Sequence, residues 1–499
     1  MLPIYPYDTS RLWDHFSAQQ LGINSFELLD KAGIAIAQEL RKHLDGNTLV
    51  VFIAGKGNNG GDAIRAATYL IKWGYNAIVW SVLPQKTPSL ENSRCADEFK
   101  LLFADRWFEN TEIDNLSQLP KSTIIVDGIL GTGYKGVLDE STALLINKIN
   151  SSGLRCWSID IPSGLHETSF NKDDEVIIAE KTFTVESPKI CFLFPEFEKY
   201  VGEIEIVRIG LSEEFITTNP PWAYFIANNE KPSLKKRSKF AHKGLFGHLL
   251  LYAGSTGKAG AAILAADAAL SIGCGKVTVH TPFNCVLPIQ ICIPEAMVEA
   301  DSNLNYWSET SNLSNVTMAC GPGLGNENES LQALETLLAQ QTNSLLLDAD
   351  ALNLLARNKT LLKMLPANSI LTPHALEFDR LTTKHATFLS RLDRAKVFAK
   401  DYRVFVVLKN AYTFICCPDG TTYVNGTGCP GMAKAGSGDV LTGMIGGLLA
   451  KGLSPLEATL QGVWYHGKAG EIATQKKGQE SVLARDIIRA IPDALAAHF

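Results

Sequence analysis

Short apolar runs alternate with helical patterns along most of this chain, and this alternation limits the fold more than any other feature. A strand, a helix and then another strand predict a mostly parallel sheet with helices on both faces. In the first half we expect strands at Leu49–Ala54, Ala77–Val82, Thr123–Val126, Cys156–Ile161 and Lys181–Val185. Helices are expected at Gln19–Arg41, Gly61–Trp73 and Ser141–Ile149.

The stretch Ser212–Lys243 interrupts this pattern with prolines and the basic run Lys235-Lys236-Arg237, which we interpret as a solvated linker rather than a nucleic-acid patch. We therefore expect a domain over residues 1–220, a linker over 221–243 and a second domain over 244–499. Strands are expected there at Leu249–Ala253, Lys276–His280, Thr317–Cys320, Ser344–Asp348 and Val404–Lys409. Expected helices are Gly260–Ile272, Asp439–Lys451, Pro455–Thr474 and Ala484–Ala497.

The overall composition excludes several classes of protein. The 499 residues carry a formal net charge of −6, which argues against a dedicated nucleic-acid or membrane-surface binder. The ten cysteines show no CxxC pairing, so free thiols in a reducing compartment are expected. With neither a signal peptide nor an apolar stretch of membrane-spanning length, the sequence predicts a cytoplasmic protein.

The segment Gly436-Ser437-Gly438-Asp439 is the most specific chemical signal in the second half. Small residues at the start of a helix expose backbone amides, which bind anions such as phosphate. Asp439 is not needed for that binding, and an acid next to transferring phosphate is suited to be a general base. The alternative is that Asp439 only caps a glycine-rich turn.

Several other loops of the second half follow predicted strands, where open α/β sheets place their binding residues. They are Gly254–Ala262, Cys320–Gly325, Leu347–Asn353, Thr372–Glu377 and Leu408–Thr413. With Asn425–Ala433 and His466–Gly470, this ordered set resembles the ribokinase-like ADP/ATP-dependent NAD(P)H-hydrate dehydratase family over nearly all of residues 240–499. In that family a hydroxyl on C6 of the reduced nicotinamide ring is phosphorylated and then eliminated.

The resemblance implies roles for individual residues. Asp439 would be the base on the hydroxyl, and the amides of Gly436, Ser437 and Gly438 would stabilise the transferred phosphoryl group and hold the nucleotide. The hydrate would be contacted by Ala262, Gly325 and His374, and the nucleotide by Lys409, Asn410, Ala411, Tyr412 and Thr413. Mg²⁺ is expected because phosphate oxygens in transfer need further charge neutralisation.

In the first half, the run Gly55-Lys56-Gly57-Asn58-Asn59-Gly60-Gly61-Asp62 follows a predicted strand and begins a helix. Together with Val126–Gly133 and Ser158–Gly164, it resembles the NAD(P)H-hydrate epimerase family over about residues 10–212. Asp160 is our candidate acid/base for proton movement at the ring, although it could instead cap the loop before Pro162. Hydrate contacts are implied for Asn58, Asn59, Gly60, Gly61, Asp62, Gly131, Thr132, Gly133, Tyr134, Lys135, Gly136, Val137 and Asp160. Asn59, Asp127 and Ser163 match the ligands of a K⁺ ion.

Both resemblances together predict two three-layer αβα domains, Rossmann-like in the first half and ribokinase-like in the second. They imply an enzyme that epimerises the R and S hydrates of NADH and NADPH (NADHX and NADPHX) and dehydrates the S form with ADP, giving AMP and phosphate. A homo-oligomer without nucleic-acid or membrane partners is expected. The alternative is a ribokinase-like small-molecule kinase whose first half is a non-catalytic dimerisation or RNA-binding module.

Overall fold

The structure is a computed structural model that describes residues 1–83, 86–109, 116, 118–168, 175–232 and 237–496. Two compact units make up the chain, one of Leu2–Trp222 and one of Ala223–Phe499 together with Met1. Within the basic run of the expected linker, Lys235 and Lys236 lie outside the described residues, as does Ala497 at the end of the last expected helix.

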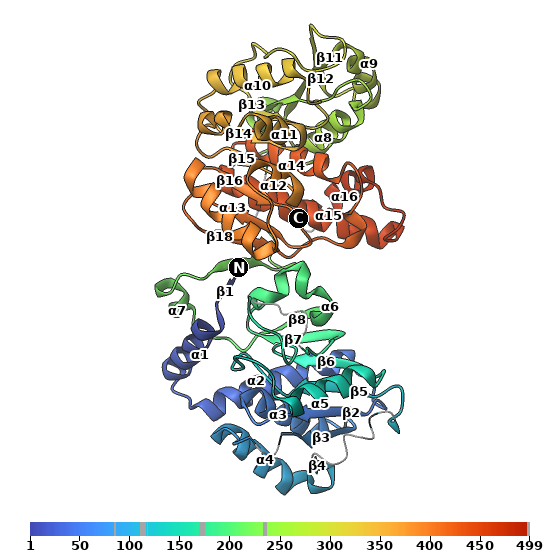
Figure 1. Ribbon diagram of the computed structural model, residues 1–499. Helices are drawn as coiled ribbons and strands as arrows, with labels where there is room; N and C mark the ends of the chain where they lie inside the picture. The colour runs from blue at the N-terminus through green and yellow to red at the C-terminus, as the bar shows by residue number, and fades with distance from the viewer. Residues whose placement is uncertain (84–85, 110–115, 117, 169–174, 233–236, 497–499) are drawn as a thin grey trace. The chain divides into compact units, whose positions relative to one another are not determined.

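The first unit is built on a seven-stranded sheet in the order β4-β3-β2-β5-β6-β7-β8, and neighbouring strands are parallel throughout (Figure 1). All five residues of β2 are buried, as expected for a central strand covered on both faces. The strands are β2 (Val50–Ala54), β3 (Ala77–Ser81), β4 (Trp107–Glu109), β5 (Ile124–Gly128), β6 (Arg155–Ile159), β7 (Lys181–Val185) and β8 (Glu203–Val207). A short strand, β1 (Leu2–Ile4), precedes them.

Helices cover both faces of this sheet. Phe52 packs with residues of α2, α3 and α4, whereas its neighbour Ile53 packs with α5, because successive strand residues point to opposite faces. The helices are α1 (Tyr7–Leu21), α2 (Ser25–Leu40), α3 (Asn58–Lys72), α4 (Leu90–Phe103), α5 (Glu140–Ser151), α6 (Glu198–Val201) and α7 (Glu213–Thr218).

One expected helix of the first unit is wrong. Gln19–Arg41 is divided between α1 and α2, because Gly22 adopts a left-handed conformation (φ 66°) that ends α1. Asn24 then caps α2, and a reciprocal bond joins Glu27 to the Asn24 amide.

The sheet of the second unit runs β9-β18-β17-β16-β15-β14-β13-β10-β11-β12. Its pairs are parallel except for β16–β17 and β17–β18, which are antiparallel. Strand β9, which lies within the stretch expected to be a linker, pairs with β18. The strands are β9 (Ala223–Ile226), β10 (His248–Tyr252), β11 (Lys276–Pro282), β12 (Met297–Asp301), β13 (Thr317–Cys320), β14 (Leu345–Leu347), β15 (Ile370–Leu371), β16 (Phe405–Leu408), β17 (Thr413–Cys416) and β18 (Thr422–Asn425).

Helices α8, α14, α15 and α16 form one apolar core with this sheet, and α10 to α13 lie on its other face (Figure 1). Gly443 allows helix α14 to approach α8 closely, because it has no side chain. A Cβ at this position would lie 2.0 Å from the Ala265 carbonyl oxygen. The helices are α8 (Ala259–Ser271), α9 (Phe283–Cys292), α10 (Asn328–Gln340), α11 (Ala349–Arg357), α12 (Ala375–Leu381), α13 (Phe388–Tyr402), α14 (Ser437–Ala450), α15 (Pro455–Lys477) and α16 (Ala484–Ala496).

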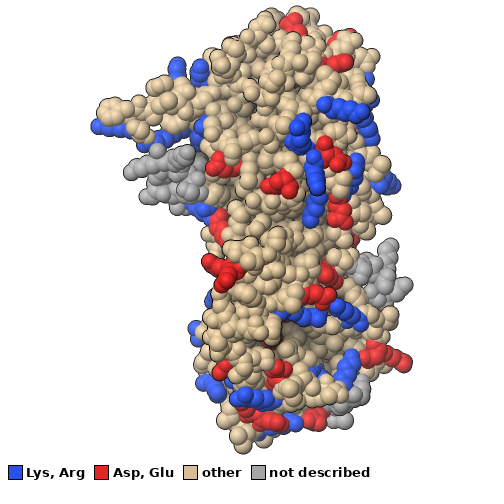
Figure 2. Space-filling model, turned by 90° about the vertical axis from the view of Figure 1, so that its left-hand side faces the viewer, with Lys and Arg blue, Asp and Glu red and all other residues tan. Residues whose placement is uncertain are grey.

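The predicted α/β class with two parallel-rich sheets is therefore confirmed. Within the described ranges, no helix combines the length and hydropathy needed to cross a bilayer. On the face shown in Figure 2, Lys and Arg side chains are interspersed with Asp and Glu side chains.

Candidate active sites

The first turn of α14 forms the centre of the candidate site in the second unit. Gly436 is the residue before the helix and has φ 90°, and a Cβ there would lie 2.5 Å from Leu264 Cδ1, so glycine is required. Ser437 and Gly438 follow, which makes Asp439 the third helical residue rather than the cap. The Ser437 amide donates to the Lys434 carbonyl oxygen at 3.3 Å.

Asp439 lies close to a buried ion pair. Lys409 Nζ is 2.9 Å from Asp348 Oδ1, and Thr442 Oγ1 donates to Asp348 Oδ2 at 2.6 Å. Burial raises the pKa of Asp439 to about 7, with a further contribution from the Asp348 charge and an opposing one from Lys409. A carboxylate with this pKa can accept a proton near neutral pH, which suits a general base.

Asp348 comes from the end of β14 and Lys409 from the end of β16, so the sheet edge brings them together. Burial disfavours the charged form of Asp348, but Lys409 and Thr442 together hold the pKa of this carboxyl below its usual value. Lys409 Nζ also lies 3.9 Å from Glu377 Oε2. Lys409 was expected to contact nucleotide, whereas its partnership with Asp348 was not foreseen.

His374 follows β15 and Gly325 follows β13, the two strands on either side of β14. His374 caps α12 through Nδ1, which accepts from the amides of Leu376 and Glu377, so its Nε2 carries the proton of the neutral ring. Burial lowers the pKa of His374. The Gly325 amide donates to Asp350 Oδ2 at 2.9 Å.

The other residues expected to contact hydrate or nucleotide in the second unit lie in α8 and in the turn after β16. Ala262 is fully buried in α8 beneath Gly254, whose Cβ would lie 3.4 Å from that of Ala262. Asn410, Ala411 and Tyr412 form the turn between β16 and β17, and Thr413 begins β17.

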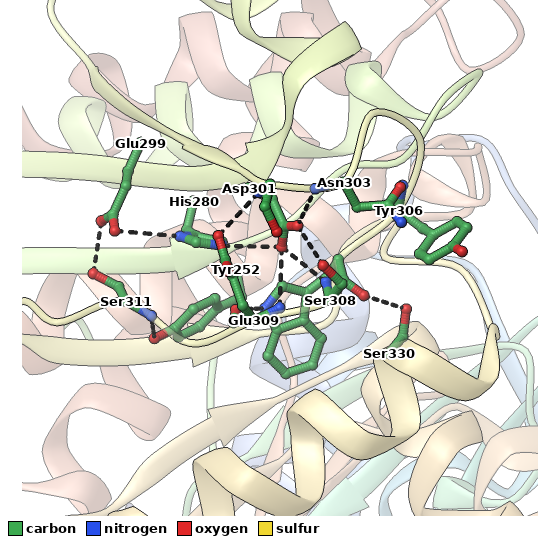
Figure 3. Close-up of polar contacts among 12 residues, drawn as sticks. Tyr252, His280, Glu299, Asp301, Asn303, Tyr306, Ser308, Glu309, Ser311 and Ser330 are labelled. Atoms are coloured by element: carbon green, nitrogen blue, oxygen red, sulfur yellow. Dashed lines mark hydrogen bonds and ion pairs between the residues drawn. The ribbon is translucent and has the colours of Figure 1, made fainter.

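A buried polar network is centred on Asp301, at the end of β12 (Figure 3). Asp301 accepts hydrogen bonds from His280 Nε2 at 3.2 Å and from Ser308 Oγ at 2.6 Å, and these hold the segment after β12 in place. From that segment, the Asn305 carbonyl oxygen accepts the Thr256 amide at 2.8 Å. No sequence signal identified this network, because its members come from separate strands and loops.

In the first unit, the candidate site begins at the glycine-rich loop before α3. Gly60 is packed so closely that a Cβ would lie 2.1 Å from the Gly55 carbonyl oxygen. Asn92 Nδ2 donates to the carbonyl oxygens of Gly55 (3.0 Å) and Gly57 (2.9 Å) and so fixes the loop. Asn58 Oδ1 accepts from Ser89 Oγ at 2.7 Å. Asn92 lies on α4, far along the chain, and was not foreseen.

Of the expected K⁺ ligands, Asn59 and Ser163 contact the Leu130 carbonyl oxygen, and Asp127 joins them through Ser163. Asn59 Nδ2 donates to that oxygen at 2.8 Å. Ser163 Oγ lies 3.2 Å from it, donates its proton to Asp127 Oδ1 at 2.6 Å and accepts the Leu130 amide at 2.8 Å. Asn59 Oδ1 is buried and has no hydrogen-bond partner among the described residues. A buried oxygen without a hydrogen-bond partner fits a weakly held cation.

Asp160 lies in a cluster of carboxylates around Lys189. Its Oδ1 is 2.7 Å from Lys189 Nζ and accepts the Val185 amide at 3.1 Å, and its backbone is left-handed (φ 62°). Burial raises the pKa of Asp62 well above its usual value, and Asp160 and Asp14 add to the rise. Burial also raises the pKa of Asp14 to about 7, against the effect of Lys189. Sequence reasoning missed both Asp14 and Lys189.

The expected hydrate loop spans residues 131–137 and is mostly exposed. Gly131 adjoins the K⁺ candidate, since a Cβ there would lie 3.0 Å from that of Asn59. Thr132 accepts a bond from Arg11 at 2.6 Å, and Lys135 pairs with Asp8 at 3.0 Å. Val137 is 89% exposed. Gly133, Tyr134 and Gly136 lie between these residues, and the Tyr134 hydroxyl donates to the Gly136 carbonyl oxygen.

Known proteins are similar in sequence to this chain over nearly its whole length. Residues 249–493 match the family model of NAD(P)H-hydrate dehydratase, and residues 25–191 match that of the YjeF-related protein N-terminus. A solved ADP/ATP-dependent NAD(P)H-hydrate dehydratase from Bacillus subtilis, co-crystallised with ATP and Mg²⁺, is 31% identical, covers 56% of this chain and 99% of its own, and gives a TM-score of 0.49.

Curated relatives extend across both units. A bifunctional NAD(P)H-hydrate repair enzyme of Moorella thermoacetica is 32% identical, with 97% of this chain and 94% of that protein covered. Those of Thermofilum pendens (32%, with 98% and 95% covered) and Escherichia coli (31%, with 97% and 92% covered) are similar. This chain therefore belongs to the family of bifunctional NAD(P)H-hydrate repair enzymes.

Proposed function

We propose that residues 244–499 dehydrate the S hydrate of NADH or NADPH at the expense of ADP, with Asp439 as the general base. The observation that carries this proposal is the first turn of α14, where a carboxylate with a pKa of about 7 lies beside helix-terminal amides. A base, an anion site and a buried lysine within one loop cluster are the parts that phosphoryl transfer requires.

In this proposal Asp439 takes the proton of the C6 hydroxyl while the oxygen attacks the terminal phosphorus of ADP, and AMP leaves. The amides of the first turn of α14 and the Lys409 ammonium stabilise the charge on the transferring group. The C6–O bond then breaks, phosphate departs with the electron pair, and loss of the C5 proton restores the reduced nicotinamide.

Mg²⁺ would enter with the nucleotide rather than in a cage of carboxylates. Asp348 and Glu377 already face Lys409, and the described residues contain no cluster of three or more His, Cys, Asp or Glu that could hold a metal. Mg²⁺ bound to phosphate oxygens would supply charge neutralisation. We infer that the chain's part is to hold those phosphates at α14.

We further propose that residues 1–220 interconvert the R and S hydrates, with Asp160 as the acid/base. Lys189, 2.7 Å from Asp160 Oδ1, would hold that carboxylate in position. K⁺ would be held by Asn59, Asp127 and Ser163, and would fix the Leu130 loop against α3. The unpartnered Asn59 Oδ1 supports this role. The cytoplasmic location and the homo-oligomer remain predictions.

The test uses the full chain, racemic NADH hydrate, Mg²⁺, K⁺ and either ADP or ATP, and follows the near-ultraviolet absorbance of reduced nicotinamide. Complete recovery of NADH with AMP and phosphate supports both activities with ADP as the donor. Recovery of only the S half supports the dehydratase and contradicts the epimerase. A stable phosphorylated product would instead indicate a small-molecule kinase.

A further inference from the structure

The second unit contains an open cavity of about 530 Å³ that contains none of the proposed phosphoryl-transfer groups. Its lining comes from α11, α12 and the loop after Gly325, the elements that also carry Asp348, His374 and Gly325. We call it the arginine pocket, and its lining residues are Asn326, Asn353, Ala356, Arg357 and Arg380.

Asp350 joins the arginine pocket to the position expected to contact the hydrate. Its Oδ2 accepts the Gly325 amide at 2.9 Å, while its Oδ1 accepts the side-chain amides of Asn326 and Asn353, each at 3.3 Å. Arg380 lies six residues after His374, about 9 Å along the axis of α12. A ligand extending from His374 along α12 therefore reaches the arginine pocket.

The charge of the arginine pocket is uncompensated. Arg357 bonds to the Asn326 carbonyl oxygen and to Asn328 Oδ1, and Arg380 bonds to Asn353 Oδ1 at 3.0 Å. All three acceptors are neutral, and among the described residues neither arginine forms an ion pair. The nearby carboxylate of Asp350 is taken by Lys258 at 3.0 Å. Two guanidinium groups with spare N–H donors suit a phosphate group.

We propose that the arginine pocket binds a phosphate group of the dinucleotide hydrate while the nicotinamide ring lies at Asp439. This inference rests on the proposed dehydratase function. Two phosphates share this chemistry: the pyrophosphate bridge, present in both NADH and NADPH hydrates, and the 2′-phosphate, present only in NADPH hydrate. Arg380 and Arg357 are accordingly substrate-specificity residues, separate from the phosphoryl-transfer groups at α14.

The test compares the full-length wild-type chain with Arg380→Ala, Arg357→Ala and Arg380→Lys, and measures kcat and KM for the S hydrates of NADH and NADPH and for ADP. Loss of a charge-assisted bond should raise KM for the hydrate roughly 10- to 100-fold and leave KM for ADP unchanged. For Arg380→Lys the KM for the hydrate should lie between the values of the wild type and Arg380→Ala. Lysine keeps the positive charge but lacks the two parallel N–H donors of the guanidinium group. The matched control is Arg394→Ala, which removes a 40%-exposed arginine side chain from α13.

The pattern across substrates identifies the phosphate. If KM rises for both hydrates, the bound group is the pyrophosphate bridge. If KM rises for NADPH hydrate alone, it is the 2′-phosphate. An unchanged hydrate KM in Arg380→Ala and Arg357→Ala overturns the inference while wild-type turnover keeps the dehydratase function. A rise in KM for ADP alone also overturns it. If the wild type turns over neither hydrate, the proposed function fails first and this inference with it.

Discussion

At the scale of single residues, the raised pKa of Asp439 predicts the pH dependence of dehydration. A base must be deprotonated to act, and burial with the Asp348 charge brings the pKa of Asp439 to about 7. We expect kcat/KM to rise with pH through an acidic limb near 7 and then level off. Asp439→Asn should lower kcat by about 10²- to 10⁴-fold, the usual contribution of a general base. An acidic limb near the ordinary aspartate value would contradict this assignment.

The raised pKa of Asp439 also makes the stability of the folded chain depend on pH. Because its pKa is higher folded than unfolded, the folded chain binds more protons, and its stability falls as pH rises from about 4 to about 7. Asp439→Asn should therefore make the second unit more stable to urea above pH 7 while it removes activity. Asp379→Asn should have the opposite effect. Arg391 lowers the pKa of Asp379, so this substitution should make the second unit less stable to urea.

The unpartnered Asn59 Oδ1 predicts a specific response to K⁺. Asn59→Ala removes an oxygen that has no hydrogen-bond partner among the described residues. The rate of epimerisation in K⁺ should therefore fall by about 10- to 100-fold, to the rate in Na⁺. Dehydration of the pure S hydrate by the same variant is the internal control and should be unchanged. Equal epimerisation rates in K⁺ and Na⁺ for the wild type would exclude a K⁺ role.

Glycine-rich turns could be recognised from the sequence, and the residues that hold them could not. Asp439 and Asn59 adjoin Gly438 and Gly60, so local spacing marked them. Asn92 and Lys189 reach their sites from other elements, and a lone Asn on a helix or a lone Lys in a loop has no distinctive pattern. Only tertiary packing brings such residues to a site.

At the scale of elements, Asp301 determines the order of the segment between β12 and β13. It accepts bonds from Ser308 and His280, which together more than offset burial and lower the pKa of Asp301 to about 2. Asp301→Asn should destabilise the second unit by about 1.5–3 kcal/mol, since bonds to a buried charge are lost. Hydrogen exchange of residues 302–309 and urea unfolding would measure both effects.

The sign of the accompanying pH effect follows from the lowered pKa. Asp301 contributes its stability above the unfolded value near 3.9, and this contribution is lost as pH falls through about 2. The difference in stability between the wild type and Asp301→Asn should therefore shrink below pH 4. A constant difference would mean that the carboxylate charge is not what orders the segment.

Element prediction was most accurate where long apolar or periodic runs exist and failed at short or divided elements. Lys181–Val185 was predicted with the observed bounds of β7, whose three central residues are all buried. β15 has only two residues, Ile370–Leu371, and its pairing with β14 and β16 cannot be inferred locally. Gly22 and the capping pair Asn24 and Glu27 are sequence signals for the break between α1 and α2. The prediction missed it because the apolar periodicity continues across the break.

At the scale of the whole molecule, each candidate site is built entirely within one unit, so the two activities should be separable by mutation. Asp439 and its partners Asp348 and Lys409 lie within Ala223–Phe499, whereas Asp160 and Lys189 lie within Leu2–Trp222. We expect Asp439→Ala to abolish dehydration and leave epimerisation intact. Asp160→Asn should do the reverse, so that racemic hydrate yields only half of the NADH. The measurement is separate assay of S-hydrate consumption and of R-to-S conversion. Mixing the two variants should restore complete recovery, because the S hydrate diffuses between them; loss of both activities in either variant would mean that the units do not work independently.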